Sequence, residues 1–146
     1  PLTSYGHKPA TRARLTRMWQ TAHASGRVKV AAVRASDFYG PAVTRAALGD
    51  LSLGRIARGQ SAQCLGDVDL PHSFSYVPDV ARALQTVGAA SDDIFGQAWH
   101  VPNAPDRSLR ALLQLFADEV KRPLKVSVLP GLVLTVGGMV NRNLKK

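Results

Sequence analysis

The residues Val33-Arg34-Ala35-Ser36-Asp37-Phe38-Tyr39-Gly40-Pro41 end a short β-branched, apolar run at 28–33 and open a loop at 37–41. Upstream, residues 9–24 are predicted to form a helix, because Pro9 suits its first turn and Gly26 follows its end. A helix, a glycine and then a buried strand is the order typical of an α/β sheet. Ligands of such sheets bind at the carboxyl ends of strands, so the 37–41 loop is a candidate binding site.

Downstream, the same alternation of helical and extended patterns continues. Helices are predicted at 44–58, 79–87 and 109–120, and short strands at 62–65, 73–77, 98–101 and 124–129. The helix at 109–120 has the clearest pattern, because its leucines and Phe116 repeat near 3.6 residues and Ser108 is suited to cap it. The apolar stretch 131–140 is too short to span a bilayer and is predicted to be a helix packed on the body. The fold class is therefore α/β.

Composition limits the class of protein. The chain has 146 residues, a formal net charge of +9 and a single cysteine, so it forms no intramolecular disulfide. This fits a reducing compartment, and we expect a cytoplasmic protein with no membrane span. It begins with Pro1 rather than Met and shows no signal-peptide pattern, which favours a piece of a longer protein.

The basic charge is concentrated near the start of the chain. Residues 1–36 contain seven basic side chains and no acidic one. Such a segment is either an electrostatic footprint for nucleic acid or the solvated face of one helix. The solvated face is the favoured interpretation, and nucleic-acid binding is kept as the weaker alternative, which would show a steep dependence on salt.

Several kinds of chemistry are absent from the sequence. The four histidines are scattered and no Cys/His cluster has zinc spacing, so no metal site is predicted. There is no G-x-G-x-x-G, no P-loop with its lysine and no G-x-S-x-G nucleophile elbow. The sequence itself therefore contains no phosphate cradle.

Two stretches together resemble one family. The 33–41 segment resembles the "R-P-x-N-x-Y-G-P" segment of the extended short-chain dehydrogenases, the NAD-dependent epimerase/dehydratase family. About thirty residues later, His72-Ser73-Phe74-Ser75-Tyr76-Val77-Pro78-Asp79-Val80-Ala81-Arg82-Ala83 resembles its "R-D-F-x-Y-V-x-D-V-A-R-A" segment. Residues 96–101 and the following helix resemble its "G-x-x-F-N-V" strand and the helix after it. The resemblance covers the whole chain but only the C-terminal half of a family member.

The resemblance implies a fold and a division of the chain. It implies late elements of a Rossmann-like parallel sheet plus a small C-terminal α/β substrate domain. Residues 1–41 would be a late Rossmann helix and strand, 42–75 a substrate-domain segment, 76–101 a return to the Rossmann sheet, and 102–146 the C-terminal substrate domain. The glycine fingerprint that brings backbone N–H groups to the pyrophosphate would lie upstream, so this piece should not bind NAD or NADP with normal affinity.

The resemblance also implies a catalytic pair. The family has Tyr-x-x-x-Lys, in which the tyrosine is the acid/base and the lysine ammonium lowers its pKa and holds the nicotinamide ribose. Lys8 stands at the lysine position, but Ser4 is four residues earlier and Tyr5 three. Either Tyr5 acts after a local shift, or the tyrosine is lost and the protein is inactive. Pro9 counts against the first interpretation, because it disfavours helical angles at Lys8.

Further positions carry over from the family with departures. Ala35, Ser36 and Asp37 are predicted to lie on the cofactor side with Lys8, although Ala35 replaces a proline and Asp37 an asparagine. Phe38 and Tyr39 are predicted to line the substrate cleft. His72 is also a substrate-site candidate, at a position where sugar-nucleotide epimerases often place an arginine on the diphosphate. A mostly neutral imidazole lacks the bidentate fork of arginine, so a nucleotide-sugar substrate is less favoured.

The resulting hypothesis is the C-terminal part of an NAD(P)-dependent epimerase, dehydratase or reductase that acts on a sugar-like or other small carbonyl or hydroxyl substrate and is inactive in isolation. The cofactor, NAD or NADP, would bind the full-length parent, and a homodimer could form through the 9–24 helix. The main alternative is a non-catalytic, Rossmann-like binding or redox-sensing protein. Substrate identity and the choice between NAD and NADP stay open.

Overall fold

The structure, a computed structural model, describes residues 7–129, with Lys8 described through its backbone. The chain divides into two compact units, each made of two segments. Among the described residues, the first unit comprises 7–34 and 80–101, and the second comprises 35–79 and 102–129. The elements are α/β in kind, as predicted, and three of the four strand pairs are parallel.

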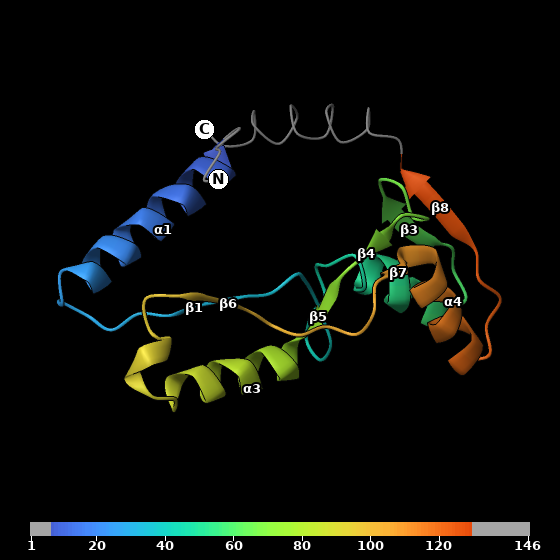
Figure 1. Cartoon of the computed structure of the whole chain (residues 1–146). Helices are drawn as coiled ribbons and strands as arrows, with labels where there is room; N and C mark the ends of the chain where they lie inside the picture. Colours follow the sequence, from blue (N-terminus) through green and yellow to red (C-terminus); the bar gives the residue numbers. More distant parts are fainter. Residues whose placement is uncertain (1–6, 130–146) are drawn as a thin grey trace. The chain divides into compact units, whose positions relative to one another are not determined.

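The first unit contains a helix, a parallel strand pair and most of a second helix (Figure 1). Helix α1 is His7–Ala24, strand β1 is Ala32–Arg34, helix α3 is Val77–Gly88, a 3₁₀ turn follows at Asp92–Ile94, and strand β6 is Ala98–His100. Strands β1 and β6 pair in parallel, with Val33 opposite Trp99. The Nδ1 atom of His23 accepts a hydrogen bond from the Val30 N–H (3.3 Å) and so joins α1 to the chain before β1.

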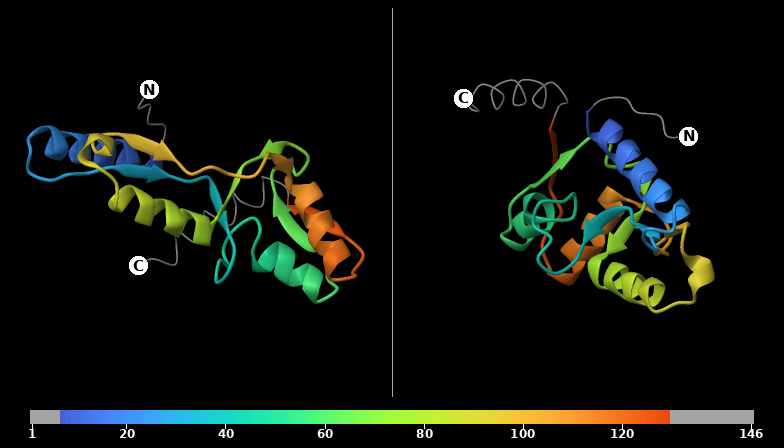
Figure 2. Two further views of the ribbon diagram at one scale, coloured as in Figure 1. Left: turned by 60° about the horizontal axis from the view of Figure 1, so that its bottom comes forward. Right: turned by 90° about the vertical axis from the view of Figure 1, so that its left-hand side faces the viewer.

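The second unit carries the larger core. Its elements are β2 (Asp37–Tyr39), a π-helical turn (Asp50–Gly54) that continues as α2 (Arg55–Ala57), β3 (Ala62–Leu65), β4 (Pro71–His72), β5 (Phe74–Tyr76), β7 (Arg107–Ser108), α4 (Leu109–Glu119) and β8 (Val126–Leu129). The pairs β2–β5 and β3–β8 are parallel, and β4–β7 is antiparallel. The π-helical turn before α2 contacts both β3 and α4, and side chains of β3 and α4 share one core cluster (Figure 2).

The core of the second unit is formed by apolar side chains of α2, β3 and α4 and of the segments between them. Its buried members are Leu48, Ile56, Ala62, Cys64, Val68, Leu109, Leu113 and Ala117. Helix α4 is amphipathic, and its apolar face is the one that supplies Leu109, Leu113 and Ala117. Its start was predicted correctly, because the Ser108 Oγ accepts a hydrogen bond from the Ala111 N–H (3.2 Å) as a helix N-cap does.

Several predicted elements were wrong in extent or kind. The segment 37–41, predicted to be a loop, begins with strand β2, because its backbone pairs with β5. The helix predicted at 44–58 forms only over 50–57. Gly49 is extended and packs against the Thr44 carbonyl, which accepts the Asp50 N–H (2.9 Å), so the preceding residues form a turn instead. The strand predicted at 28–33 begins only at Ala32, while α3 begins earlier than predicted, at Val77. The helix predicted at 131–140 lies outside the described residues.

Leu15, Met18, Trp19 and Ala22 stand at i, i+3, i+4 and i+7, a spacing that predicts one apolar stripe on α1. In the structure, half of this stripe is exposed. Leu15 and Met18 are 53% and 59% exposed, whereas Trp19 and Ala22 are half-buried. Ala13, on the same helix, is buried. Periodicity indicates which side chains share a helix face, but a side chain is buried only where another element covers it. In the described part of the first unit, little covers Leu15 and Met18.

An exposed ion pair ties α4 to the loop before β4. Arg110 binds Asp69 in a bidentate manner, with Nε to Oδ1 at 2.7 Å and Nη2 to Oδ2 at 3.1 Å. The Arg110 N–H also donates to the Val68 carbonyl (2.9 Å). The hydrogen bond from Arg110 lowers the pKa of Asp69 below its usual value of 3.8.

This pair predicts a small pH dependence of stability. Because the pKa of Asp69 is lower in the folded state, the unfolded state binds more protons at acidic pH, and stability rises with pH there. We expect the stability advantage of the wild type over Asp69→Asn to be present above about pH 4 and to vanish as pH falls further. Urea unfolding at several pH values measures it. Arg110→Gln should abolish the same dependence, and its persistence in that variant would assign it to another group.

Candidate functional site

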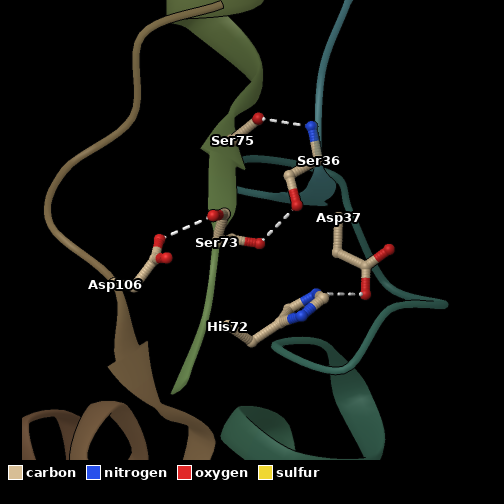
Figure 3. A network of polar contacts seen from close by, with 6 residues as sticks. All are labelled: Ser36, Asp37, His72, Ser73, Ser75 and Asp106. Atoms are coloured by element: carbon tan, nitrogen blue, oxygen red, sulfur yellow. Dashed lines mark hydrogen bonds and ion pairs between the residues drawn. The ribbon is translucent and has the colours of Figure 1, made fainter.

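A network of polar contacts holds the start of β2 to its neighbouring strand (Figure 3). The Ser36 N–H donates to the Ser75 Oγ (2.9 Å), and the Ser36 Oγ donates to the Ser73 carbonyl (2.6 Å). The Ser75 Oγ in turn donates to the Asn103 Oδ1 (2.8 Å), and the Ser73 Oγ donates to the Asp106 Oδ1 (2.6 Å). All of these residues belong to the second unit, so the network fixes the backbone of residues 36 and 37 within it.

Asp37 and His72 form a hydrogen-bonded pair at the edge of this network. Their Oδ2 and Nε2 atoms are 3.0 Å apart, and their side chains are 64% and 49% exposed. The imidazole of His72 also lies edge-on to the Phe74 ring, with the two ring centroids 4.8 Å apart. The two residues that the sequence assigned to the cofactor side and to the substrate are thus brought into direct contact.

A pocket of about 1130 Å³ opens beside this pair, within the second unit. Asp37 and Phe38 line it from β2, and Cys64 and Leu109 line it from β3 and α4. Cys64 is 3% exposed, and burial raises the pKa of its thiol. The thiol is therefore held in its protonated form at neutral pH.

Two aromatic residues support the β2 end of the site. The rings of Tyr39 and Tyr76 contact each other with centroids 5.3 Å apart, and Tyr39 packs against the core. Next to them, Gly40 has a φ of +124°, and a Cβ atom there would lie 2.8 Å from the Tyr76 ring. The close approach of this turn to the ring therefore depends on glycine.

The predicted site residues fall into separate groups. Asp37 and Phe38 line the pocket, Ser36 is hydrogen-bonded to β5 and its neighbour, Ala35 is half-buried, and Tyr39 packs inward. Lys8 lies in the first turn of α1, so its backbone is helical despite the proline that follows. Tyr5 lies outside the described residues. The catalytic pairing of Tyr5 with Lys8 and the cofactor roles of Ala35, Ser36 and Asp37 stay predictions.

Sequence reasoning missed the polar partners of this site. Ser73 and Ser75 alternate with aromatic residues in His72–Tyr76, and this period of two places both hydroxyls on one face of a strand. That alternation was the available signal for Ser75, which is fully buried. Asn103 and Asp106 come from a distant loop, and nothing local in the sequence connects them to it.

Replacing Ser75 with Ala should destabilise the second unit by about 1–3 kcal/mol, because the Ser36 N–H loses its buried acceptor and Asn103 loses its donor. Chemical denaturation measures the loss. Ser73→Ala is the matched control, since its hydroxyl binds an exposed carboxylate, and it should cost less. Equal losses in the two variants would contradict a special role for the buried hydroxyl.

Comparison with known proteins defines the class of fold. No family model and no curated protein sequence matches this chain. Solved structures do match it. The epimerase Mth375 from Methanothermobacter thermautotrophicus superposes with a TM-score of 0.73 at 16% identity, covering 88% of this chain and 39% of that protein. The structural neighbours are NAD-dependent epimerases and dehydratases.

Two further neighbours carry bound ligands. The UDP-N-acetylglucosamine 4-epimerase from Methanobrevibacter ruminantium M1, in complex with UDP-N-acetylmuramic acid, has a TM-score of 0.69 at 22% identity, with 83% of this chain and 39% of that one covered. A dTDP-glucose 4,6-dehydratase from Streptomyces venezuelae with NAD bound has a TM-score of 0.72 at 18% identity, with 90% and 41% covered. The chain thus has their fold over about two-fifths of their length, which confirms the resemblance at the level of the fold.

The described residues hold neither a metal-binding cluster nor a membrane-spanning helix. Within residues 7–129, no group of three or more His, Cys, Asp or Glu side chains is arranged to hold a metal ion. In the same part of the chain, no helix combines the length and the apolar character that crossing a bilayer requires.

Proposed function

We propose that this chain is the C-terminal part of an NAD(P)-dependent epimerase, dehydratase or reductase that acts on a sugar-like or other small carbonyl or hydroxyl substrate. One observation supports this proposal most directly. Asp37, predicted to lie on the cofactor side, and Phe38, predicted to contact the substrate, both line the pocket beside β2. Residues 1–41 and 76–101 would supply late Rossmann elements, and 42–75 and 102–146 the substrate domain. The likeness to NAD-bound neighbours supports this assignment.

The residues present fit a nicotinamide more readily than a whole dinucleotide. The hydrogen bonds of Ser36 hold residues 35–37 in one backbone conformation, which suits a segment that lies against a flat ring. The sequence has no glycine-rich turn for the pyrophosphate. NAD(P) would supply the hydride acceptor, and Tyr5, with Lys8 beside it, would move the proton of the substrate hydroxyl. We therefore expect the isolated chain to be inactive and its full-length parent to bind the cofactor.

The test begins with the full-length parent. NAD(H) and NADP(H) are titrated into it, and turnover is then compared for wild type and Tyr5→Phe across a panel of carbonyl substrates. We expect one dinucleotide to bind and the variant to turn over more slowly. Absence of dinucleotide binding would contradict the proposal, whereas unchanged turnover in the variant would remove only Tyr5 from it.

A non-catalytic binding or redox-sensing role is the second candidate, and the Tyr-x-x-Lys spacing favours it. The same titration separates the two, because dinucleotide binding without turnover supports this role. A homodimer through the 9–24 helix also stays a proposal, and the exposed Leu15 and Met18 support it.

A further inference from the structure

The charged side chains around the pocket are mostly acidic. Among the described residues, Asp37 and Asp50 line it and Arg45 is the basic residue that does. A ligand phosphate in this pocket would therefore meet two carboxylates and one guanidinium. Like charges placed next to one another in a binding site cost affinity and reject the wrong partner.

His72 does not offset this charge toward a ligand. Its Nε2 atom is occupied by the Asp37 carboxylate at 3.0 Å, and its ring lies edge-on to Phe74. A single imidazole held in this way cannot form the two parallel hydrogen bonds by which a guanidinium binds a phosphate. Beside the pocket, His72 therefore contributes no bidentate cation to a phosphate, whereas Asp37 contributes a carboxylate to the lining.

The remaining wall of the pocket is largely apolar. Phe38, Leu51 and Leu65 line it and are each about half exposed or more, at 48%, 57% and 54%. Val43 and Leu109 continue the same surface. Apolar side chains left exposed in a concave site are typical of ligand pockets, where a few polar groups set the orientation of an apolar ligand.

From these observations we infer that the pocket takes an uncharged carbonyl or hydroxyl compound with an apolar body, and that it rejects compounds carrying a diphosphate. This inference rests on the proposed function and narrows its substrate class. The volume of about 1130 Å³ accommodates such a compound. The apolar wall would hold its body, while the Asp37–His72 pair would exclude phosphate and offer a carboxylate to a hydroxyl.

The test compares two probes on the full-length parent by calorimetric titration: UDP, and the uncharged bicyclic ketone 2-decalone. We expect the wild type to bind 2-decalone at least roughly tenfold more tightly than UDP. The Leu51→Ala variant should bind 2-decalone more weakly than the wild type and should bind UDP with unchanged affinity. Wild-type binding of UDP as tight as that of 2-decalone, or no binding of 2-decalone, would overturn the inference.

Changing the charges of the Asp37–His72 pair should have the opposite effect and increase the affinity for UDP. The double variant Asp37→Asn, His72→Arg removes a carboxylate and adds a guanidinium, and should bind UDP roughly tenfold to a hundredfold more tightly than the wild type. Asp106→Asn is the matched control, because this carboxylate accepts from Ser73 in the same network, and it should leave UDP binding unchanged. An equal gain in the control, or no gain in a folded double variant, would overturn the role assigned to the pair.

The two proposals fail in different ways. Tight UDP binding by a parent that also binds NAD(P) would overturn the substrate class alone. A parent that binds no dinucleotide would contradict the proposed function, while the comparison of UDP with 2-decalone would still measure the charge preference of the pocket.

Discussion

Replacing Leu113 with Ala is expected to lower the free energy of unfolding of the second unit by about 2–5 kcal/mol. Leu113 is fully buried on the inner face of α4, within the cluster that includes Ile56, Ala62 and Cys64. The truncation removes the transfer free energy of the buried methyl groups and leaves a cavity that the surrounding side chains fill only in part. Urea unfolding followed by far-UV circular dichroism measures the change.

Leu115→Ala is the matched control for this substitution. It lies on the same helix and removes the same atoms, but its side chain is 52% exposed. We expect a loss well under that of Leu113→Ala, on the order of 0.5 kcal/mol. Similar losses for the two variants would show that α4 does not pack through the face that carries Leu113.

The second large effect is expected for Gly40→Ala, at about 2–4 kcal/mol. Two causes act together at this position. The φ of +124° is one that side chains with a Cβ atom rarely adopt, and the added Cβ would lie 2.8 and 2.9 Å from two carbons of the Tyr76 ring. Relief requires the ring to move, and Tyr76 is in contact with Tyr39 beside the candidate site. Thermal and chemical denaturation measure the loss, and near-UV circular dichroism reports the tyrosine environment.

Gly66→Ala separates the two causes. Gly66 also has a positive φ, of +73°, but no atom lies within 4 Å of a Cβ built there. It should therefore show only the backbone cost, about 1–2 kcal/mol, with an unchanged near-UV spectrum. If Gly40→Ala were no more destabilising than this control, the contact with the Tyr76 ring would have no energetic consequence.

Local patterns were sufficient for several elements of the fold. The helices at 9–24 and 109–120 follow from periodicity and from the residues at their ends, and the strand at 62–65 follows from the turn residues that come after it. All of these signals act over a few neighbouring residues. Where the prediction failed at 37–39, a distant partner decided the outcome, because β5 pairs with these residues and makes them a strand. The failure at 44–49 is local: the Thr44 carbonyl accepts the Asp50 N–H, and the segment closes as a turn instead of a helix.

The candidate site shows the same division. The sequence was enough to select Asp37, Phe38 and His72, because they stand in segments that resemble one family. It did not indicate that Asp37 and His72 bind each other, since they are 35 residues apart in the chain. It also did not indicate the contact of Ser75 with Asn103, which joins residues 28 positions apart.

The amino-acid order alone thus established an α/β chain, its two helices of clearest pattern and the lack of a glycine phosphate cradle, because those properties depend on short-range geometry. Packing decided which face of α4 is buried and that Leu15 and Met18 of α1 are exposed. It also decided that a pocket opens beside β2, with a largely apolar wall and two carboxylates in its lining. These features depend on which distant segments pack together. The free energy that stabilises this packing comes from many contacts and cannot be assigned to any single stretch of sequence.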